Sequence, residues 1–431
     1  MTKHAILAAA ALSTAAAPAF AVGLDRSGQN ITAIFAEDNT ASFSIIQVNP
    51  EVTGEDLAGG GSYDTSVGRG QIRPQFNYTG SLSEDFNFAF IADAPYGANV
   101  NYDADPLTTA LGGTTADLDS SAFTFIGRYK LGGGFSVFGG MALQTVGADV
   151  SLNGTAYASA ISTSAVTRTF NAGLPAGVPQ LDSSTLGAAL LGDPAAAASI
   201  DGTYGAGTTT TLGTSVGTTV AGFNASGGYT FDMENSNAPN FLIGAAYEIP
   251  SIALRISGTY RFETEHSADV TETLLGTTTT GSVDYVTPAS FNLDFQTGIA
   301  PGTLLTASYR WTDFTAIEVI PPTLGQDLVE REDGHRYTLG IGRQFSDKLA
   351  GSALLIYEPE VSSDLVSPLD PITSNFGVGL GARFTDGPLQ VTGGAFYSWL
   401  GDSRPEVGGT AVASFEDNYS VSYALQLSYQ F

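Results

Sequence analysis

Apolar and small polar residues alternate most clearly over the last fourteen positions of the chain, residues 418–431. Side chains of a β-strand point to its two faces in turn, so this segment has one apolar face. That face carries Tyr419, Val421, Tyr423, Leu425, Leu427, Tyr429 and Phe431. The opposite face is small and polar. One lipid-facing side and one polar side are typical of a transmembrane strand, although a strand of a soluble sandwich can look alike.

Weaker versions of the same alternation recur along the chain and predict fourteen strands. They cover residues 41–48, 70–80, 86–94, 120–130, 135–149, 238–248, 251–264, 288–299, 303–314, 334–345, 349–358, 374–384, 389–400 and 418–431. Residues 221–232 also alternate. A fifteenth strand would make the count odd, so we assign this segment to the long connection that contains it.

The connections between these strands alternate in length. The short ones are 81–85, 131–134, 249–250, 300–302, 346–348 and 385–388, and the long ones are 49–69, 95–119, 150–237, 265–287, 315–333, 359–373 and 401–417. Short periplasmic turns and long extracellular loops are the layout of an outer-membrane barrel. The pattern therefore predicts an all-β, fourteen-stranded antiparallel transmembrane β-barrel over residues 41–431. A soluble all-β protein is the alternative.

Residues 182–199 change period within the longest connection, 150–237, and predict a small helical segment. Ser183 and Ser184 are candidate caps, and Leu186, Leu190 and Leu191 lie on or near one helical face. Pro194 either interrupts the helix or starts a second one. An apolar helix on an outer loop fits a landing site for a hydrophobic molecule, or a loop that packs on its own barrel rim.

Composition narrows the classes of protein. The 431 residues include no cysteine, carry a net charge of −27 and contain 52 glycines. No disulfide or thiolate metal site is therefore possible, and the charge argues against nucleic-acid binding. The mature part contains no apolar run long enough for a transmembrane helix. Residues 1–21 have a basic start, an apolar run and a small-x-small site before position 22, so they are expected to be a signal peptide.

The long loops are rich in acidic residues, which we expect to form a solvated face that can reach lipopolysaccharide through divalent cations. These are Asp103, Asp105, Asp117, Asp119, Glu330, Glu332, Asp333, Asp402, Glu406, Glu416 and Asp417. No spacing resembles a dedicated calcium loop, and we expect neither a metal nor a cofactor.

Five stretches of the sequence resemble segments of one known family. Residues 22–29 (VGLDRSGQ) are similar to the family's mature N-terminus, and residues 43–54 to its first strand and loop. Residues 92–97 (ADAPYG) are similar to the end of its third strand, and residues 307–314 and 336–342 to later strands. None of these stretches is a strict motif, but their order and spacing resemble the FadL/TodX family of outer-membrane transporters for hydrophobic compounds.

The resemblance implies a monomeric barrel plugged by an N-terminal hatch, here residues 22–40. It implies passive uptake of long-chain fatty acids or other hydrophobic compounds, which outer loops capture and which leave sideways beside a kinked third strand. The final Phe431 resembles the C-terminal signal of bacterial outer-membrane barrels, so outer-membrane lipids and the barrel-assembly machinery are the expected partners. We therefore expect the bacterial outer membrane as the location.

Three groups of candidate site residues follow. Pro95 and Gly97 weaken the third strand and mark a candidate lateral exit, or simply the end of the strand. Seven arginines on polar strand faces should point into the lumen: Arg73, Arg128, Arg255, Arg261, Arg310, Arg336 and Arg383. They are expected to pair with Asp294, Glu248 and Glu263, or to meet a head group or the hatch acids Asp25, Glu37 and Asp38. Candidates for apolar substrate contact are Leu186, Leu190, Leu191, Phe223, Phe231, Ile31, Ile34 and Phe35.

Passive transport of hydrophobic compounds is the function that these features favour. A general porin for small hydrophilic solutes and a non-transporting surface barrel or adhesin are the alternatives. Enzyme chemistry has little support, because only His266 and His335 remain after the predicted cleavage and no nucleophile–histidine arrangement is evident.

Overall fold

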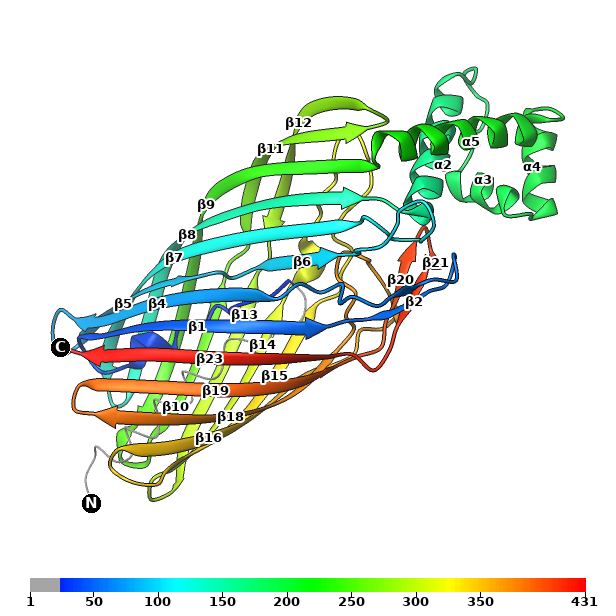
Figure 1. Ribbon diagram of the computed structural model, residues 1–431. Coiled ribbons are helices and arrows are strands. Elements are labelled where there is room, and N and C mark those ends of the chain that lie inside the picture. Colours follow the sequence, from blue (N-terminus) through cyan, green and yellow to red (C-terminus); the bar gives the residue numbers. More distant parts are fainter. Residues whose placement is uncertain (1–23) are drawn as a thin grey trace.

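The structure is a computed structural model that describes residues 24–431, and it forms a closed barrel with four helices at one end (Figure 1). The predicted signal peptide, residues 1–21, lies outside the described residues. The C-terminus lies at the end of the barrel opposite to the helices (Figure 1).

Fourteen antiparallel segments form the wall, and three of them consist of two consecutive strands. They are β1 (Thr40–Glu51), β4 (Gln71–Ser81), β5 (Phe86–Asp93) with β6 (Gly97–Asn101), β7 (Thr115–Gly132), β8 (Phe135–Leu152), β9 (Tyr229–Ile249), β10 (Leu254–Arg261) with β11 (Thr264–Leu274), β12 (Thr277–Thr287) with β13 (Ser290–Ala300), β14 (Thr303–Thr312), β15 (Gly334–Gln344), β16 (Leu349–Glu358), β18 (Asn375–Asp386), β19 (Leu389–Leu400) and β23 (Tyr419–Gln430). β23 pairs with β1 from Thr40–Gln430 to Glu51–Tyr419 and closes the barrel. The predicted fourteen-stranded barrel is confirmed.

The outward face of the wall is apolar over the part of the barrel that we assign to the membrane. Large apolar side chains such as Phe76, Phe125, Ile243 and Leu425 are exposed there. Aromatic rings gather near the loop end of β14 to β23, and neighbouring pairs are Tyr309–Tyr337 (5.2 Å), Phe376–Trp399 (5.8 Å) and Tyr397–Tyr419 (5.5 Å). Such a girdle is expected at the membrane interface.

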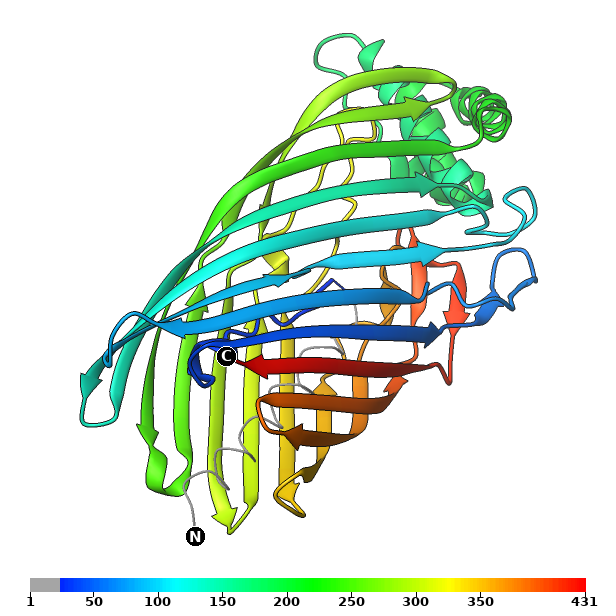
Figure 2. The same cartoon turned by 60° about the vertical axis from the view of Figure 1, so that its left-hand side comes forward.

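The wall is taller on the side of β7, β8, β9, β11 and β12 (Figure 2). The prediction that residues 265–287 form a loop was wrong, because β11 and β12 pair from Thr264–Thr287 to Leu274–Thr277 around a tight turn. Outward positions in this part are polar, as at Glu265 and Asp269, whereas Val270 is buried. The polar outer face indicates that this extension stands in water beyond the bilayer.

The connection from β8 to β9 contains four helices rather than one short helical segment. They are α2 (Thr155–Ala172), α3 (Ser183–Leu190), α4 (Pro194–Tyr204) and α5 (Thr208–Ser226). Asp182, not a serine, caps α3, and its carboxylate accepts a hydrogen bond from the Ser184 backbone N–H at 2.7 Å. Pro194 starts α4. Residues 221–226 belong to α5 and residues 229–232 begin β9, so no fifteenth strand forms.

The four helices form a bundle beside the outer end of the wall (Figure 1). Leu181, Leu186, Ile200, Leu212 and Val216 make up its core. The sequence did not suggest α2 and α5, because their many Ala, Gly, Ser and Thr residues leave a weak apolar stripe. No helix within residues 24–431 has both the length and the hydropathy needed to cross a bilayer.

A large apolar core fills the tall part of the barrel, where the outer loops fold back inside the wall. Tyr229, Phe231 and Val270 from the wall pack with Tyr102 and Phe415 from the loops. Short loop strands support this core: β2 (Gly54–Asp56), β3 (Ser62–Tyr63) and β22 (Ala413–Phe415) in one sheet, and β17 (Leu365–Val366), β20 (Arg404–Val407) and β21 (Thr410–Ala411) in another. The outer loops are therefore packed against one another and against the wall.

Candidate functional site

The described N-terminal residues, from Leu24 to the start of β1, lie inside the barrel and act as a plug (the dark blue segment in Figure 2). Their short helix η1 (Thr32–Phe35) sets Ile31 and Ile34 against the inner wall. There the two isoleucines contact an apolar patch, which consists of Ala89, Ile91, Ile126, Phe138, Leu242 and Ala246. Burial of this face holds the plug to the β5–β9 side of the lumen.

Phe35 at the end of η1 lies between two arginines of the wall. Its ring contacts Phe138 edge-on, with the centroids 5.8 Å apart. The guanidinium carbons of Arg128 and Arg255 lie 4.6 and 4.4 Å from the centre of the Phe35 ring. Cation–π attraction strengthens when water is excluded, so these contacts fix the periplasmic end of the plug.

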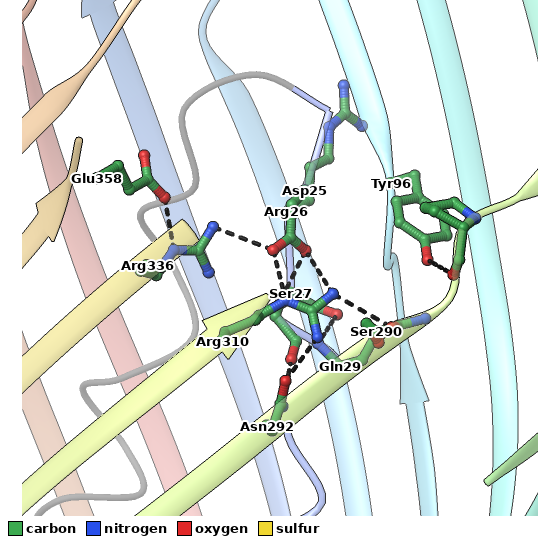
Figure 3. Close-up of polar contacts among 12 residues, drawn as sticks. Asp25, Arg26, Ser27, Gln29, Tyr96, Ser290, Asn292, Arg310, Arg336 and Glu358 are labelled. Atoms are coloured by element: carbon green, nitrogen blue, oxygen red, sulfur yellow. Dashed lines mark hydrogen bonds and ion pairs between the residues drawn. The ribbon is translucent and has the colours of Figure 1, made fainter. Parts of the chain in front are cut away.

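Asp25 joins the other end of the plug to the opposite wall (Figure 3). The Arg310 Nε donates to one carboxylate oxygen of Asp25 at 2.7 Å, and the Arg310 Nη2 donates to the other oxygen at 3.3 Å. The Arg336 Nη2 lies 3.2 Å from the same carboxylate, and its Nε donates to Glu358 at 2.5 Å. Asp25 is buried, so this three-residue ion pair is the main polar anchor of the plug.

Further hydrogen bonds tie the plug backbone and side chains to the wall. Gln29 accepts from Ser290 Oγ at 3.0 Å and from Arg310 Nη2 at 3.2 Å. The Thr79 hydroxyl donates to the Ala33 carbonyl at 2.6 Å. These contacts come from strands on several sides of the lumen, so the plug bridges the barrel rather than lining one strand.

The wall is interrupted beside the plug, between β4 and the β5–β6 pair. The ladder of β4 with β5 ends at Phe76–Ala92, so residues 71–75 of β4 continue past the end of that ladder. β5 ends at Asp93 and β6 starts at Gly97, which leaves Ala94, Pro95 and Tyr96 as a break. This is where the sequence predicted a weakened strand at Pro95 and Gly97.

The plug pairs with this break through its own backbone. Asp25 and Tyr96 form an antiparallel bridge. The Arg26 N–H donates to the Pro95 carbonyl at 2.8 Å, and the Gly97 N–H donates to the Leu24 carbonyl at 2.9 Å. Residues 24–26 therefore give Pro95–Gly97 the backbone hydrogen bonds that β4 does not provide at this height of the barrel.

All seven predicted lumen arginines lie on the inner side of the wall. Six of them have the following contacts: Arg73 with the Arg26 carbonyl, Arg128 with Glu248, Arg255 with Phe35, Arg261 with Asn240, and Arg310 and Arg336 with Asp25. The seventh, Arg383, is buried in the inner wall. Of the acids considered from the sequence, Glu248 and Asp25 are in ion pairs, Asp38 accepts from Asn87, and Asp294 lines a lumen cavity.

The predicted substrate-contact residues are scattered rather than gathered in one site. Leu186 is buried in the helix bundle, whereas Leu191 is 88% exposed and Leu190 is partly exposed. Phe223 and Phe231 belong to the outer apolar core. Ile31, Ile34 and Phe35 hold the plug to the wall. Their contact with a substrate stays a prediction, and for the buried ones it would require the bundle, the outer core or the plug to move.

Two cavities flank the Asp25 anchor. One, of about 200 Å³, lies on the side of the outer loops between Arg331, Glu332, Arg336, Glu358 and Ile372. The other, of about 80 Å³, lies along the inner wall and is lined by Ser27, Gly28, Asp294, Arg310 and Leu354, among others. Both are polar at the plug, in contrast to the apolar core above it.

Two outer loops are joined by an ion pair at the surface. Arg404 donates from Nε and Nη2 to the Asp364 carboxylate at 2.6 and 2.8 Å. These hydrogen bonds hold the pKa of Asp364 below its ordinary value. The pair joins the loop after β16 to the loop after β19.

The sequence did not single out Arg26 or Tyr96, and it placed Asp119 only among the acids of the solvated face. Arg26 comes from the plug and Asp119 from the outer face of β7, and their side chains meet at the break at 3.0 Å. Contact between residues 93 positions apart leaves no local signal. The predicted weakness of the strand at Pro95 and Gly97 was the only hint of where this contact lies.

The comparisons with known proteins agree with this architecture. The model of the family described as "Outer membrane protein transport protein (OMPP1/FadL/TodX)" matches residues 5–386. The chain belongs to this family. It is thus an outer-membrane β-barrel of a family that transports hydrophobic compounds. No curated protein matches the sequence.

Solved structures of low sequence identity share the fold over nearly the whole chain. A FadL homologue from Pseudomonas aeruginosa is 14% identical, with a TM-score of 0.64 over 97% of this chain and 96% of that one. The Pseudomonas putida toluene transporter TodX is 13% identical, with a TM-score of 0.59 over 98% of both chains. The Ralstonia pickettii toluene transporter TbuX is 12% identical, with a TM-score of 0.56 over 97% of both.

Proposed function

We propose that this protein takes up long-chain fatty acids or other hydrophobic compounds passively, through capture by the outer loops, binding in the lumen and lateral diffusion into the membrane. The observation that carries the proposal is that the plug crosses the lumen while the wall beside it is interrupted at Ala94–Tyr96. An apolar molecule that leaves through the wall need not pass the polar periplasmic side.

The apolar outer core supports the capture step. Its wall residues Phe231 and Val270 and its loop residue Phe415 lie inside the tall part of the barrel, where loops rather than strands cover them. Loops can separate at a smaller cost than a hydrogen-bonded wall, because local opening needs the loss of fewer contacts. A hydrophobic compound would replace the apolar contacts that the loops give up.

The general-porin alternative fits less well, because the plug and its anchor at Asp25, Arg310 and Arg336 stand across the lumen. The surface-barrel alternative does not account for a break in the wall that residues 24–26 of the plug cover. Both alternatives nevertheless make clear predictions. A porin gives a steady ohmic conductance in planar bilayers, and a surface barrel gives neither conductance nor uptake.

The test compares a host strain with and without the protein. Uptake of labelled oleate and labelled toluene is measured together with bilayer conductance of the purified barrel. We expect faster uptake of at least one of the two compounds and no steady conductance. Equal uptake of both compounds in the two strains would reject transport of hydrophobic compounds, and a steady conductance would favour the porin.

A further inference from the structure

Arg26 leaves the lumen and reaches the outer face of the barrel through the break in the wall. Its Nη1 donates to the Asp119 carboxylate at 3.0 Å. The Arg26 side chain is 6% exposed, whereas the Asp119 side chain is 80% exposed. A buried cation that belongs to the plug therefore pairs with a surface anion that belongs to β7.

The path of the side chain depends on Gly97. A Cβ at position 97 would lie 1.9 Å from the Arg26 Cζ, far closer than two non-bonded atoms can approach. Gly97 pairs with Asp119 across the β6–β7 ladder, so the guanidinium passes over the bare backbone of Gly97 to reach its partner. The glycine predicted to weaken the strand is also the space through which the plug arginine passes.

The break lies at the outer edge of the apolar belt. Along β7 from its periplasmic end toward the outer loops, Phe123 is the last large apolar side chain that is exposed, and Asp119 lies beyond it. The two residues are four positions apart, or about 13 Å along the strand. On the other border of the break, Ile72 of β4 is exposed. One side of the opening thus faces acyl chains, and the Asp119 side faces lipid head groups.

The closure at Arg26 is weak compared with the anchor one residue earlier. Within residues 24–431, the buried Nε and Nη2 atoms of Arg26 have no hydrogen-bond partner. A buried cation is poorly compensated by a single bond to a solvated carboxylate. Asp25, in contrast, is held by two arginines and by the Gly28 N–H.

We propose that the Arg26–Asp119 pair is the latch of a lateral opening between β4 and β5–β6, and that the carboxylate of an amphiphilic substrate releases it by taking the place of Asp119 on the guanidinium. Asp119 binds only Nη1, whereas the unpartnered Nε and Nη2 form the edge of the guanidinium that a carboxylate binds with two bonds. A substrate carboxylate on that edge would therefore compete with Asp119 for the charge of Arg26. Release withdraws the guanidinium from above Gly97 and leaves the backbone bonds of residues 24–26 to Pro95 and Gly97 to close the gap, and these bonds can open locally. This inference rests on the proposed function for its route, and it adds the residues that close the opening and the role of a substrate carboxylate in releasing them.

A single reporter cysteine tests the latch without measuring transport. The chain contains no cysteine, and Ser27, the residue after Arg26, is buried. The Ser27→Cys protein is placed in phosphatidylcholine vesicles and treated with a membrane-soluble pyrene maleimide. Arg26→Gln and Asp119→Asn are added to this background. The matched control is Asp149→Asn, which removes an exposed carboxylate from the neighbouring strand β8.

We expect Arg26→Gln and Asp119→Asn each to speed labelling about tenfold, equivalent to ~1.4 kcal/mol, and Asp149→Asn to leave it unchanged. Oleate should speed labelling when Arg26 is present and have no further effect in Arg26→Gln. Methyl oleate, which lacks the negative charge, should not speed labelling in either protein. Labelling that is equal in the parent and both latch variants would overturn the latch. An oleate effect that persists without Arg26, or that methyl oleate reproduces, would overturn release by the carboxylate.

A cross-link separates the latch from the route. Ser27 Oγ donates to Asp93 Oδ2 at 2.6 Å, so Ser27→Cys with Asp93→Cys can tie the plug to β5 below the break. Uptake by this variant should stop under oxidising conditions and return with a reductant. Uptake that continues in the oxidised protein would place the exit elsewhere. Labelling that responds as expected in a protein that transports nothing would reject the proposed function and leave the latch standing.

Discussion

Replacement of Asp25 by asparagine should release the plug while the barrel stays folded. The carboxylate accepts two bonds from Arg310 and lies 3.2 Å from Arg336 Nη2 in a buried site. Removal of one member of a buried ion pair costs about 3–5 kcal/mol, because the remaining charge stays buried without compensation. Arg336 keeps Glu358 and Arg310 keeps Asn292, so we expect the lower value.

A loss of about 3 kcal/mol corresponds to roughly a hundredfold rise in the fraction of undocked plug. Hydrogen exchange of residues 24–36, followed by mass spectrometry in detergent micelles, measures this fraction. The barrel strands should keep their protection, apart from the Gly97 N–H at the start of β6, which donates to the plug. The matched control is Asp386→Asn, which breaks an exposed pair with Lys348 and should leave plug exchange unchanged. Equal exchange of the plug in Asp25→Asn and in the parent would refute the view that this ion pair anchors it.

Two further predictions concern the extension of the wall. Glu272→Gln should speed hydrogen exchange at Thr323 and loosen the loop after β14, because the buried carboxylate accepts from the Thr323 backbone N–H at 2.8 Å. Loss of such a bond costs about 1–3 kcal/mol. The control Glu265→Gln, on the exposed face of the same strand, should have no effect. Ile243→Arg should destabilise the barrel by about 2–4 kcal/mol in lipid vesicles, whereas Asp232→Arg, also outward on β9, should change little. Equal unfolding midpoints for the two arginine variants would contradict the assigned edge of the membrane.

The strands inside the membrane could be predicted because lipid demands an apolar outer face at every second residue. The extension could not, because Phe262 and Glu263 are both exposed where β10 passes into β11. At this irregular step the outward face changes, so apolar residues such as Val270 point inward above it. Apolar and polar residues still alternate in the sequence, but in the extension the apolar residues face the lumen and the polar residues face outward.

The site was predicted in part for a related reason. A strand that contains Pro95 and Gly97 is weakened by its own residues, and that weakness can be recognised locally. The partner that covers the break comes from the plug, and a contact between Arg26 and Asp119 depends on how the barrel closes. The arginines on polar strand faces were expected in the lumen, but their choice among Asp25, Glu248 and solvent depends on the path of the plug across it.

The order of the two charges in the plug gives the proposed gate its direction of opening. Asp25 points into the lumen, where two arginines hold it, and Arg26 points outward, where one solvated carboxylate holds it. Successive side chains of an extended segment face opposite ways, so one short segment can be fastened firmly on one side and loosely on the other. Loss of the outer contact would free the Arg26 side chain, and the backbone bonds of residues 24–26 to Pro95 and Gly97 could then open while the Asp25 side chain still holds the plug in the lumen. The break could then open and close many times without release of the plug, which is the behaviour that repeated passage of substrate through the wall requires.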